Sequence, residues 1–207
     1  MNDIVLYRFP VSGHAHRVEL FCSLLNLPVK LVDVNLAAGE QKKPEFLSKN
    51  PFGQVPVIED GGVTIADSNA ILVYLASRYD KTGTWYPRDP AAAAHVQQWL
   101  SVAAGQLAAG PSTARGIKLF GFPLDHARAV TVAAQLFGVL DKELAKRKFL
   151  TGSTPTIADI AIYSYTAHAP EGGVSLEPYA NIRAWLARIE ALPGFVPMAV
   201  SRVGLAA

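Results

Sequence analysis

The sequence predicts an α/β domain followed by an all-helical domain. In the first 80 residues, strand-like and helix-like stretches follow the order β-α-β and then β-β-α. A polar segment containing Pro and Gly occupies residues 81–89, and every periodic stretch after it is helical. We therefore expect a first domain at 1–80, a linker at 81–89 and a helical domain at 90–207.

The α/β domain begins with an apolar run and one helical period. Residues 4–7 are typical of a strand buried on both faces. Residues 14–26 form an amphipathic pattern that Pro28 ends, with a stripe made by Val18, Phe21, Cys22 and Leu25. A second strand is indicated by the alternation of Val32, Val34 and Leu36. Such a strand-helix-strand unit is normally parallel with a right-handed crossover.

The second half of this domain contains a loop, a hairpin and a helix. Residues 37–50 are polar and predict a loop with at most one irregular helical turn. Strands at 55–58 and 63–66 are joined by Asp-Gly-Gly, which indicates a hairpin. Asp67 and Ser68 stand where a helix N-cap belongs. Four strands and two helices in this order follow the thioredoxin-like plan.

Four helices are indicated beyond the linker. Asp89-Pro90 caps a helix that continues through Leu107, and Gly110-Pro111 should stop or bend it. Asp125 opens a second helix. Thr156-Ile157-Ala158-Asp159 resembles a capping box ahead of a very apolar helix. A last amphipathic helix around Trp185 stops at Pro193-Gly194.

Composition excludes several function classes. Only 17% of residues are charged and the net charge is +2 without a basic cluster, which argues against a nucleic-acid partner. No uncharged apolar run approaches the roughly 18 residues of a membrane span. Cys22 is the single cysteine, so we expect a reduced, cytoplasmic protein in which that thiol is buried and inert. His14 and His16 are too isolated to indicate a metal site.

Pro56 interrupts a strand-forming stretch, between Val55 and Val57. Proline removes a ladder N–H and is normally confined to edges and turns. A cis Val55–Pro56 bond would present the Val55 main chain to a peptide-like ligand. A trans proline that opens a short edge strand explains the local sequence equally well.

Three motifs together carry a family resemblance. They are Ser12-Gly13-His14-Ala15-His16-Arg17-Val18; Asn50-Pro51-Phe52-Gly53-Gln54-Val55-Pro56 with Asp67-Ser68-Asn69-Ala70-Ile71; and Thr156-Ile157-Ala158-Asp159. In this order and spacing the chain resembles cytosolic glutathione transferases of the serine type, as in bacteria, over nearly its whole length. The resemblance implies a cis Pro56, glutathione as co-substrate with no other cofactor, and a homodimer. Phe52 and the outer faces of the helices that start after Asp67 and Asp89 are the implied dimer contacts.

The resemblance also implies the glutathione contacts. Asp67 would bind the γ-glutamyl ammonium, and Ser68 with the helix N-terminus would bind its carboxylate. The remaining implied contacts are Gln54 at the γ-glutamyl end, Val55 beside Pro56 on the cysteinyl amide, and Gln41 with Lys42 on the glycine carboxylate. Plain helix capping also explains Asp67 and Ser68, and Lys42 is equally a solvated loop lysine.

Ser12 is the implied catalytic residue. A free thiol has a pKa of about 8.5, and lowering it by two units takes ~2.7 kcal/mol. One charge-assisted hydrogen bond supplies ~1.5 to 3 kcal/mol, so a Ser12 hydroxyl at a helix start is sufficient to hold a thiolate. Tyr7 is the rival donor, but it lies within the first strand. His14 replaces the Asn or Cys of relatives, which weakens an isomerase interpretation; it would donate to the thiolate, touch the second substrate, or simply face water from a loop.

The hydrophobic electrophile is expected between the domains. Its expected walls are Phe9, Val11, His14, Trp99, Ala103, Ile117 and Phe120, although aromatic residues at helical spacing often belong to a core. The resemblance implies conjugation of the glutathione thiolate to hydrophobic electrophiles. Glutathione-dependent reduction of peroxides or disulfides is the alternative enzyme activity, and a non-catalytic ligand carrier is the alternative outside enzymes.

Overall fold

The computed structural model describes residues 4–201 and contains a four-stranded sheet in the order β2-β1-β3-β4. β1 (Ile4–Arg8) pairs parallel with β2 (Val29–Asp33) and antiparallel with β3 (Val57–Asp60). β4 (Val63–Ala66) pairs antiparallel with β3 at the edge. This is the predicted thioredoxin-like arrangement, and the parallel strand-helix-strand unit is confirmed.

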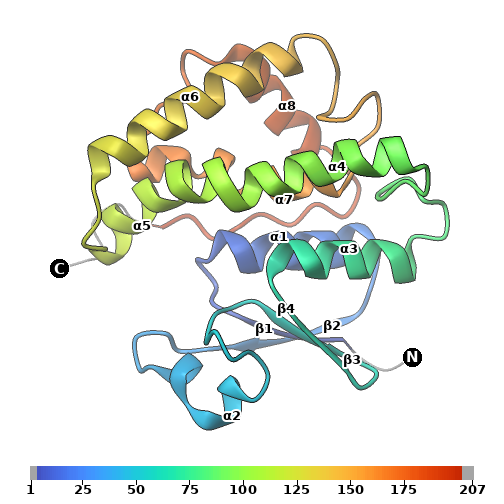
Figure 1. Ribbon diagram of the computed structural model, residues 1–207, viewed down its shortest axis with the longest axis vertical. Helices are drawn as coiled ribbons and strands as arrows, with labels where there is room; N and C mark the ends of the chain where they lie inside the picture. Colours follow the sequence, from blue (N-terminus) through green and yellow to red (C-terminus); the bar gives the residue numbers. More distant parts are fainter. Residues whose placement is uncertain (1–3, 202–207) are drawn as a thin grey trace.

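Helices cover one face of the sheet and separate it from the helical domain (Figure 1). α1 (Gly13–Leu24) and α3 (Ser68–Tyr79) lie there. The short segments η1 (Glu40–Lys42) and α2 (Pro44–Leu47) occupy the loop between β2 and β3. Phe46 of α2 packs there with Val34 and Val57 in a small second core. Cys22 is 1% exposed, and burial raises the pKa of its thiol to about 12, so the expectation of a buried, inert thiol is confirmed.

Two strand boundaries differ from the expectation. β2 begins at Val29 rather than near Val32, because the pairing register starts at Ile4 with Val29 and the apolar alternation runs on past the paired residues. β3 begins at Val57 rather than Val55, because Pro56 has no N–H to donate to the ladder. The hairpin partner at 63–66 is confirmed.

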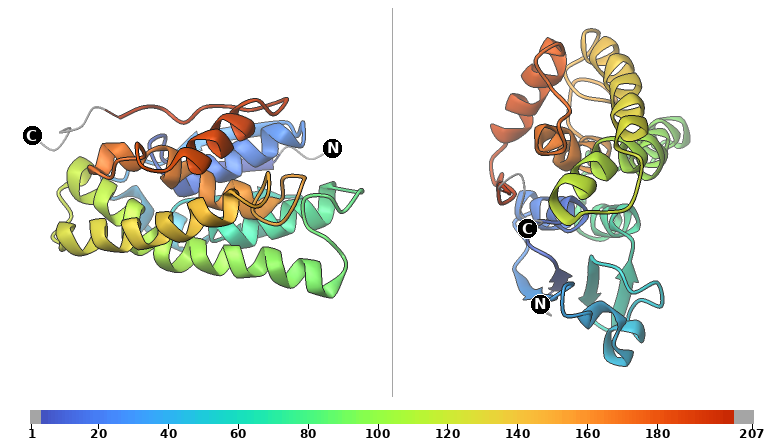
Figure 2. Two further views of the ribbon diagram at one scale, coloured as in Figure 1. Left: turned by 90° about the horizontal axis from the view of Figure 1, so that it is seen from above. Right: turned by 90° about the vertical axis from the view of Figure 1, so that its left-hand side faces the viewer.

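The rest of the described chain is helical. Its elements are α4 (Pro90–Val102), η2 (Ala103–Ser112), α5 (Thr113–Phe120), α6 (His126–Leu144), α7 (Ile157–Ala167), η3 (Ala169–Gly172) and α8 (Ala180–Glu190). The buried α7 packs against both α1 and α4. The segment after α8 returns alongside α1 (Figure 2), where the Val196 carbonyl lies 2.9 Å from His16 Nε2. None of the helices among residues 4–201 has the length and apolar character to cross a membrane.

Of the two outcomes expected at Gly110-Pro111, a stop or a bend, the stop is wrong. The helix continues from α4 through η2, a π-helical stretch of 10 residues, into α5. Pro111 has no N–H, and the wider i→i+5 bonding, in which the Thr113 N–H donates to the Ala108 carbonyl, carries the helix past it. Gly110 serves close packing instead, since a Cβ there would lie 2.8 Å from the backbone nitrogen of Ala133 on α6.

The connection between the two parts is short. α3 ends at Tyr79 and α4 begins at Pro90, and Trp85 between them stacks edge-on against Phe21 of α1. The division at 1–80, 81–89 and 90–207 agrees with these helix ends but stays a prediction, and residues 1–3 and 202–207 lie outside the described part of the chain.

Candidate active site

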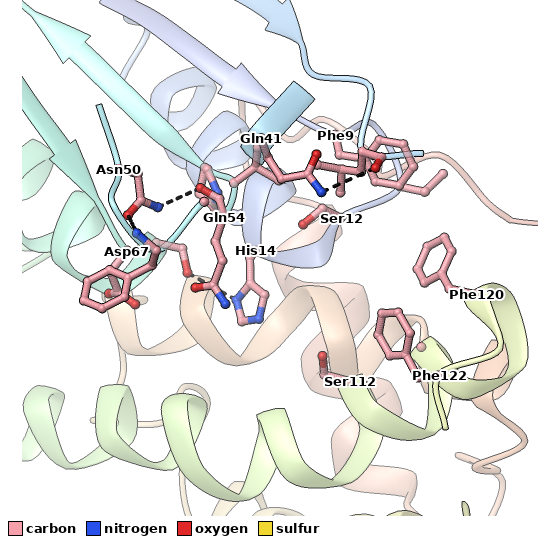
Figure 3. A pocket seen from close by; sticks show the side chains of 18 of the residues that line it. Phe9, Ser12, His14, Gln41, Asn50, Gln54, Asp67, Ser112, Phe120 and Phe122 are labelled. Carbon is pink, nitrogen blue, oxygen red and sulfur yellow. Dashed lines mark hydrogen bonds between the residues drawn. The ribbon is translucent and has the colours of Figure 1, made fainter. Parts of the chain in front are cut away.

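A cavity of about 1140 Å³ opens between the sheet domain and the helical domain (Figure 3). Its lining includes the expected residues Phe9, Val11, Ser12, His14, Gln41, Gln54, Val55, Pro56, Asp67, Ser68 and Phe120. It also includes residues that the sequence did not single out, among them Leu36, Asn50, Ser112, Arg115, Leu119, Phe122 and Tyr165. Lys42, Trp99, Ala103 and Ile117 are not part of it.

The loop before β3 exposes its main chain to the cavity. The Val55–Pro56 peptide bond is cis, as the resemblance implies. Asn50 is 3% exposed and holds this loop: its Nδ2 donates to the Gln54 carbonyl at 2.8 Å, and its Oδ1 accepts from the Phe52 N–H at 3.1 Å. Among residues 4–201 the backbone N–H and C=O of Val55 have no partner. An extended ligand can therefore pair with them.

Asp67 caps α3 in an unusual backbone conformation. Its φ is 71°, a left-handed value that non-glycine residues rarely adopt and that often marks a functional site. Its Oδ1 accepts from the N–H groups of Asn69 and Ala70, both at 2.9 Å. The predicted cap is confirmed, and Oδ2 keeps no partner within the described chain, so it remains available to a cation.

Ser68, beside this cap, belongs to a buried cluster. Arg17 is 0% exposed, and its Nη1 donates to Ser68 Oγ at 3.1 Å and to Asn69 Oδ1 at 2.8 Å. Its Nε and Nη2 have no partner in the described residues, and burial lowers the pKa of this guanidinium to about 10. A buried cation thus lies behind the N-terminus of α3. Arg17 is part of the first motif, but its burial is not readable from the sequence.

His14 completes the cluster. Its Nδ1 lies 3.3 Å from Ser68 Oγ, and its ring meets the Tyr165 ring edge-on at 4.9 Å. Burial, and secondly the charge of Arg17, lowers the pKa of His14 to about 3, so the imidazole is neutral. Because Ser68 Oγ accepts from Arg17, its own proton is free for Nδ1, which leaves the imidazole proton on Nε2. The interpretation of a loop histidine facing water is wrong: His14 lies in the first turn of α1 and lines the cavity.

Ser12 is the N-cap of α1. Its Oγ accepts from the Ala15 N–H at 3.3 Å and lines the cavity. A hydroxyl that accepts this bond still has its own proton to donate. The unpaired N–H groups and dipole of the α1 N-terminus add to an anion-binding environment at the same place.

Tyr7 points elsewhere. Its hydroxyl donates to Glu59 Oε2 at 2.8 Å, and Tyr7 is absent from the cavity lining. Burial, followed by the hydrogen bond to Glu59, raises the pKa of Tyr7. These contacts make Ser12 the better placed of the two hydroxyl groups that the sequence offers.

In the loop that carries Gln41 and Lys42, only the first of these two side chains lines the cavity. Gln41 lines the cavity, with Nε2 3.4 Å from the Leu36 carbonyl and a buried Oε1 that has no partner among the described residues. Lys42 donates to the Phe52 carbonyl at 3.2 Å and is not itself part of the lining. The structure therefore brings Gln41 to the site and leaves Lys42 outside the lining.

The other half of the cavity is aromatic and apolar. Phe9 and Phe120 have ring centroids 6.1 Å apart, and Phe120 and Phe122 are 5.6 Å apart. The expectation that Trp99, Ala103 and Ile117 form a wall of this cavity is wrong, since none of the three lines it. Ala103 is 0% exposed in the core, and Trp99 lines a second groove against α6. Ile117 follows the π stretch η2, which advances by fewer degrees per residue than an α-helix, so the face extrapolated from α4 at α-helical spacing turns away from the cavity there.

Arg115 anchors the turn in front of Ser12. Its Nη1 donates to the Val11 carbonyl at 2.8 Å, its Nε pairs with Glu171 at 2.6 Å, and its Nη2 donates to Ser201 Oγ at 2.8 Å. Burial alone would raise the pKa of Glu171, but hydrogen bonds from His168 and Arg115 hold it below its ordinary value. A charged network of the helical domain thus fixes the turn that leads into Ser12.

Comparisons with known proteins agree with this geometry. The family description "Glutathione S-transferase, N-terminal domain" matches residues 2–77, and "Glutathione S-transferase, C-terminal domain" matches residues 125–193. The chain is 34% identical to glutathione S-transferase 3 of Zea mays, over 94% of this chain and 92% of that protein. It is 30% identical to glutathione S-transferase theta-3 of Mus musculus, over 91% of this chain and 83% of that protein.

Solved structures give the same result. The crystal structure of a glutathione S-transferase from Pseudomonas fluorescens superposes with a TM-score of 0.87 at 32% identity, covering 94% of this chain and 98% of that one. A glutathione transferase homologue from Drosophila mojavensis, solved with bound glutathione, gives a TM-score of 0.86 at 30% identity, covering 93% and 90%. Among residues 4–201 no group of three His, Cys, Asp or Glu residues is arranged to hold a metal ion.

Proposed function

The chain belongs to the glutathione S-transferase family, and we propose that it conjugates the glutathione thiolate to hydrophobic electrophiles with Ser12 as the group that stabilises the thiolate. The observation that carries this proposal is the Ser12 hydroxyl, which caps α1 and faces the cavity with its proton unused. The hydroxyl supplies a donor of about the strength that a drop of two units in thiol pKa requires.

The proposed path of the thiol proton does not involve a protein base. His14 is the imidazole of α1 that lines the cavity, and its pKa of about 3 prevents it from holding a proton at neutral pH. The proton therefore leaves to water when glutathione binds, and the thiolate remains because Ser12 and the α1 N-terminus stabilise the anion better than the thiol.

The remaining groups of glutathione match the other side chains of the site. The γ-glutamyl carboxylate lies at the α3 N-terminus on Ser68, with the buried charge of Arg17 behind it. Its ammonium pairs with Asp67 and its amide with Gln54. The cysteinyl amide pairs with the free main chain of Val55 beside Pro56, and Gln41 takes the glycine carboxylate. Lys42 donates one ammonium hydrogen to the Phe52 carbonyl and keeps two others for the same glycine carboxylate.

The electrophile occupies the half of the cavity formed by Phe9, Phe120 and Phe122. Phe120 and Phe122 are 41% and 47% exposed, which is unfavourable for aromatic rings unless an apolar partner covers them. A planar, hydrophobic electrophile fits this half and lies beside the sulfur that Ser12 holds.

The variant Ser12→Ala tests the proposal. We expect conjugation of an aryl chloride to fall ~100-fold, which corresponds to about 3 kcal/mol of lost anion stabilisation, while glutathione affinity changes little. The ultraviolet absorbance of the bound thiolate should disappear with the activity. Ser101→Ala is the matched control, because Ser101 is exposed on α4 and bonds only within its own helix.

A Ser12→Ala enzyme with full activity and thiolate absorbance contradicts the assignment. Bound glutathione without thiolate absorbance in the wild type indicates a carrier instead, and faster turnover of an organic hydroperoxide than of the aryl chloride indicates a reductase.

We further propose that the protein is a cytoplasmic homodimer. Phe52 is 77% exposed in the loop before β3. A groove of about 710 Å³ between α4, η2 and α6 has a mixed lining in which Trp99, Leu136 and Val139 are apolar. Burial of these surfaces is favourable in an assembly of two copies. A mass in solution equal to one chain of 22.2 kDa contradicts the dimer.

A further inference from the structure

The peptide that leads into Ser12 is held at both of its polar ends. Its carbonyl belongs to Val11 and accepts at 2.8 Å from Nη1 of Arg115, which lies in the first turn of α5 and is 2% exposed. Its N–H belongs to Ser12 and donates to the Phe9 carbonyl at 2.9 Å. A peptide unit is planar and rigid. Arg115 therefore fixes, through one plane, the residue that carries the proposed catalytic hydroxyl.

Arg115 is itself fixed from two other sides. Its Nε pairs with Glu171 Oε2 at 2.6 Å, and its Nη2 donates to Ser201 Oγ at 2.8 Å. A Cβ built on Gly172 would lie 2.5 Å from the Arg115 backbone nitrogen, so η3 packs directly on the main chain of α5. A guanidinium is a planar fork whose donors point in fixed directions. With two of its partners and its own main chain held, the direction of its third bond, to Val11, is held as well.

Fold stability alone does not explain this ion pair. Taking both ions out of water offsets most of their attraction, and apolar groups of similar size often stabilise a fold at least as well. The pair of Arg115 and Glu171 is nevertheless buried, and Arg115 lies in the lining of the cavity. Departures from an apolar interior are expected where a site requires them. The position of this pair thus indicates a role in the site.

The local cap holds Ser12 only weakly. Its Oγ accepts from the Ala15 N–H at 3.3 Å, which is longer than the usual spacing of about 2.9 to 3.0 Å. A hydrogen bond from this hydroxyl to the glutathione sulfur depends steeply on its angle, and a displacement of about 1 Å is enough to cost 100-fold in rate. The orientation of Ser12 therefore needs a second support, and the bond from Arg115 to the preceding carbonyl provides it.

We propose that Arg115, fixed by Glu171, is the positioning residue of the thiolate site: by holding the Val11–Ser12 peptide, it orients the Ser12 hydroxyl toward the glutathione sulfur. This inference rests on the proposed thiolate chemistry. Arg115 acts through Ser12 and takes no part in the reaction itself. Its charge is balanced by Glu171, so its effect on the sulfur comes from geometry and not from a net positive charge.

Arg115→Lys tests the inference while the charge is kept. A lysine can pair with Glu171, but one ammonium does not reproduce the fork that also reaches Val11 and Ser201. We expect the pKa of glutathione bound to the full-length enzyme, followed by thiolate absorbance against pH, to rise by about one unit. The rate with the aryl chloride should fall about tenfold below that pKa and approach the wild-type rate above it, because one unit changes the thiolate fraction tenfold. The KM for glutathione should stay near its wild-type value.

This pH profile separates positioning from a general loss of structure. A variant that only loosens the fold lowers the rate at every pH and leaves the thiol pKa unchanged. Arg188→Lys is the matched control, because Arg188 on α8 also donates to a main-chain carbonyl, that of Lys148 at 3.0 Å, and neither residue lines the cavity. Its thiol pKa and pH profile should equal those of the wild type.

The inference and the proposed function fail in different ways. An unchanged thiol pKa in Arg115→Lys, with the pKa raised in Ser12→Ala, overturns the inference alone. A wild-type thiol pKa in Ser12→Ala overturns the proposed role of Ser12 and the inference with it. Adding Arg115→Lys to Ser12→Ala should raise the pKa no further, because Arg115 acts through that hydroxyl; an additive rise overturns the inference.

A second variant serves if Arg115→Lys does not fold. Arg115→Met combined with Glu171→Gln removes both charges together, so no unpaired buried charge remains. The Val11 carbonyl loses its donor while the net charge near the sulfur stays the same. We expect the same rise of about one unit in the pKa of the bound thiol. A wild-type pKa in this double variant overturns the inference.

Discussion

Replacing the buried Arg17 by methionine separates fold stability from glutathione binding. The charge is 0% exposed, and burial lowers its pKa from 12.5 to about 10. At about 1.4 kcal/mol for each pKa unit, keeping the guanidinium charged in the folded protein costs about 3 kcal/mol. Arg17→Met removes that cost but also removes two hydrogen bonds from the charged guanidinium, to Ser68 and Asn69, worth about 1.5 to 3 kcal/mol each. We expect the free energy of unfolding to stay within about 2 kcal/mol of wild type, as for other buried charges replaced by apolar groups of similar size.

Glutathione binding should respond very differently. The proposed carboxylate site at the α3 N-terminus has Arg17 as its buried cation, acting through Ser68. A hydrogen bond to a charged group contributes about 1.5 to 3 kcal/mol to the binding free energy, which corresponds to about 10- to 100-fold in the Kd for glutathione. Titration calorimetry at pH 7 gives the affinity, and urea unfolding of the same variant gives the stability. The stabilisation that saturating glutathione confers on the wild type should shrink in parallel.

Arg78→Met is the matched control, because it removes one positive charge from the surface of α3, where Arg78 lies against Asp60 at 3.2 Å with half of its side chain exposed. It should leave glutathione affinity at the wild-type value. An Arg17→Met protein with wild-type affinity refutes the role of the buried cation. A loss of more than about 4 kcal/mol in the free energy of unfolding contradicts the expectation that the buried charge lowers fold stability, since Arg17 would then stabilise the folded protein rather than serve glutathione binding alone.

Two further predictions concern stability. Asp159 is 0% exposed and accepts from the N–H groups of Leu150, Thr156 and Trp185, each at 2.9 Å, so Asp159→Ala should lower the free energy of unfolding in urea by about 3 to 5 kcal/mol. The control Asp125→Ala, which removes an exposed helix cap, should lower it by about 1 kcal/mol. Equal losses in the two variants would contradict this reasoning. Burial lowers the pKa of His16 from 6.5 to about 4, so the unfolded chain binds the proton first and stability falls as the pH drops from 6.5 towards 4, by about 3 kcal/mol at pH 4. His16→Asn should flatten the pH dependence of unfolding in that window, and an unchanged slope would show that His16 is not held neutral.

The helix starts could be predicted because they depend on neighbouring residues alone. Ser12, Asp67, Asp89, Asp125 and Thr156 each accept from an N–H two or three positions ahead. Such caps are local contacts, so a single sequence contains the information that they need. With the starts in place, the order of elements and the thioredoxin-like plan followed, and so did most of the residues at the glutathione half of the cavity.

The electrophile half could not be predicted in the same way. Helical periodicity shows which face of a segment is apolar, but Trp99 and Ala103 are apolar for other reasons, one against α6 and one inside the core. The π stretch then changes the phase between α4 and α5, and no single residue announces it beyond Pro111. Tyr165 is hidden in a different way, because it lies in a helix that is buried all round and has no amphipathic pattern to mark the side facing the site.

The first turns of α1 are held in place almost entirely by residues distant in sequence. Arg115 fixes the Val11 carbonyl, Tyr165 closes against Gly13, and Ser164 bonds to His16 at 2.9 Å. Asn69, the partner of Arg17, donates in turn to the Leu100 carbonyl of α4 at 3.1 Å. A displacement of about 1 Å between reacting groups is enough to cost 100-fold in rate. The position of Ser12 relative to its substrates therefore depends on how the helical domain packs against α1, so substitutions in α7 that touch neither substrate should still change the rate of conjugation.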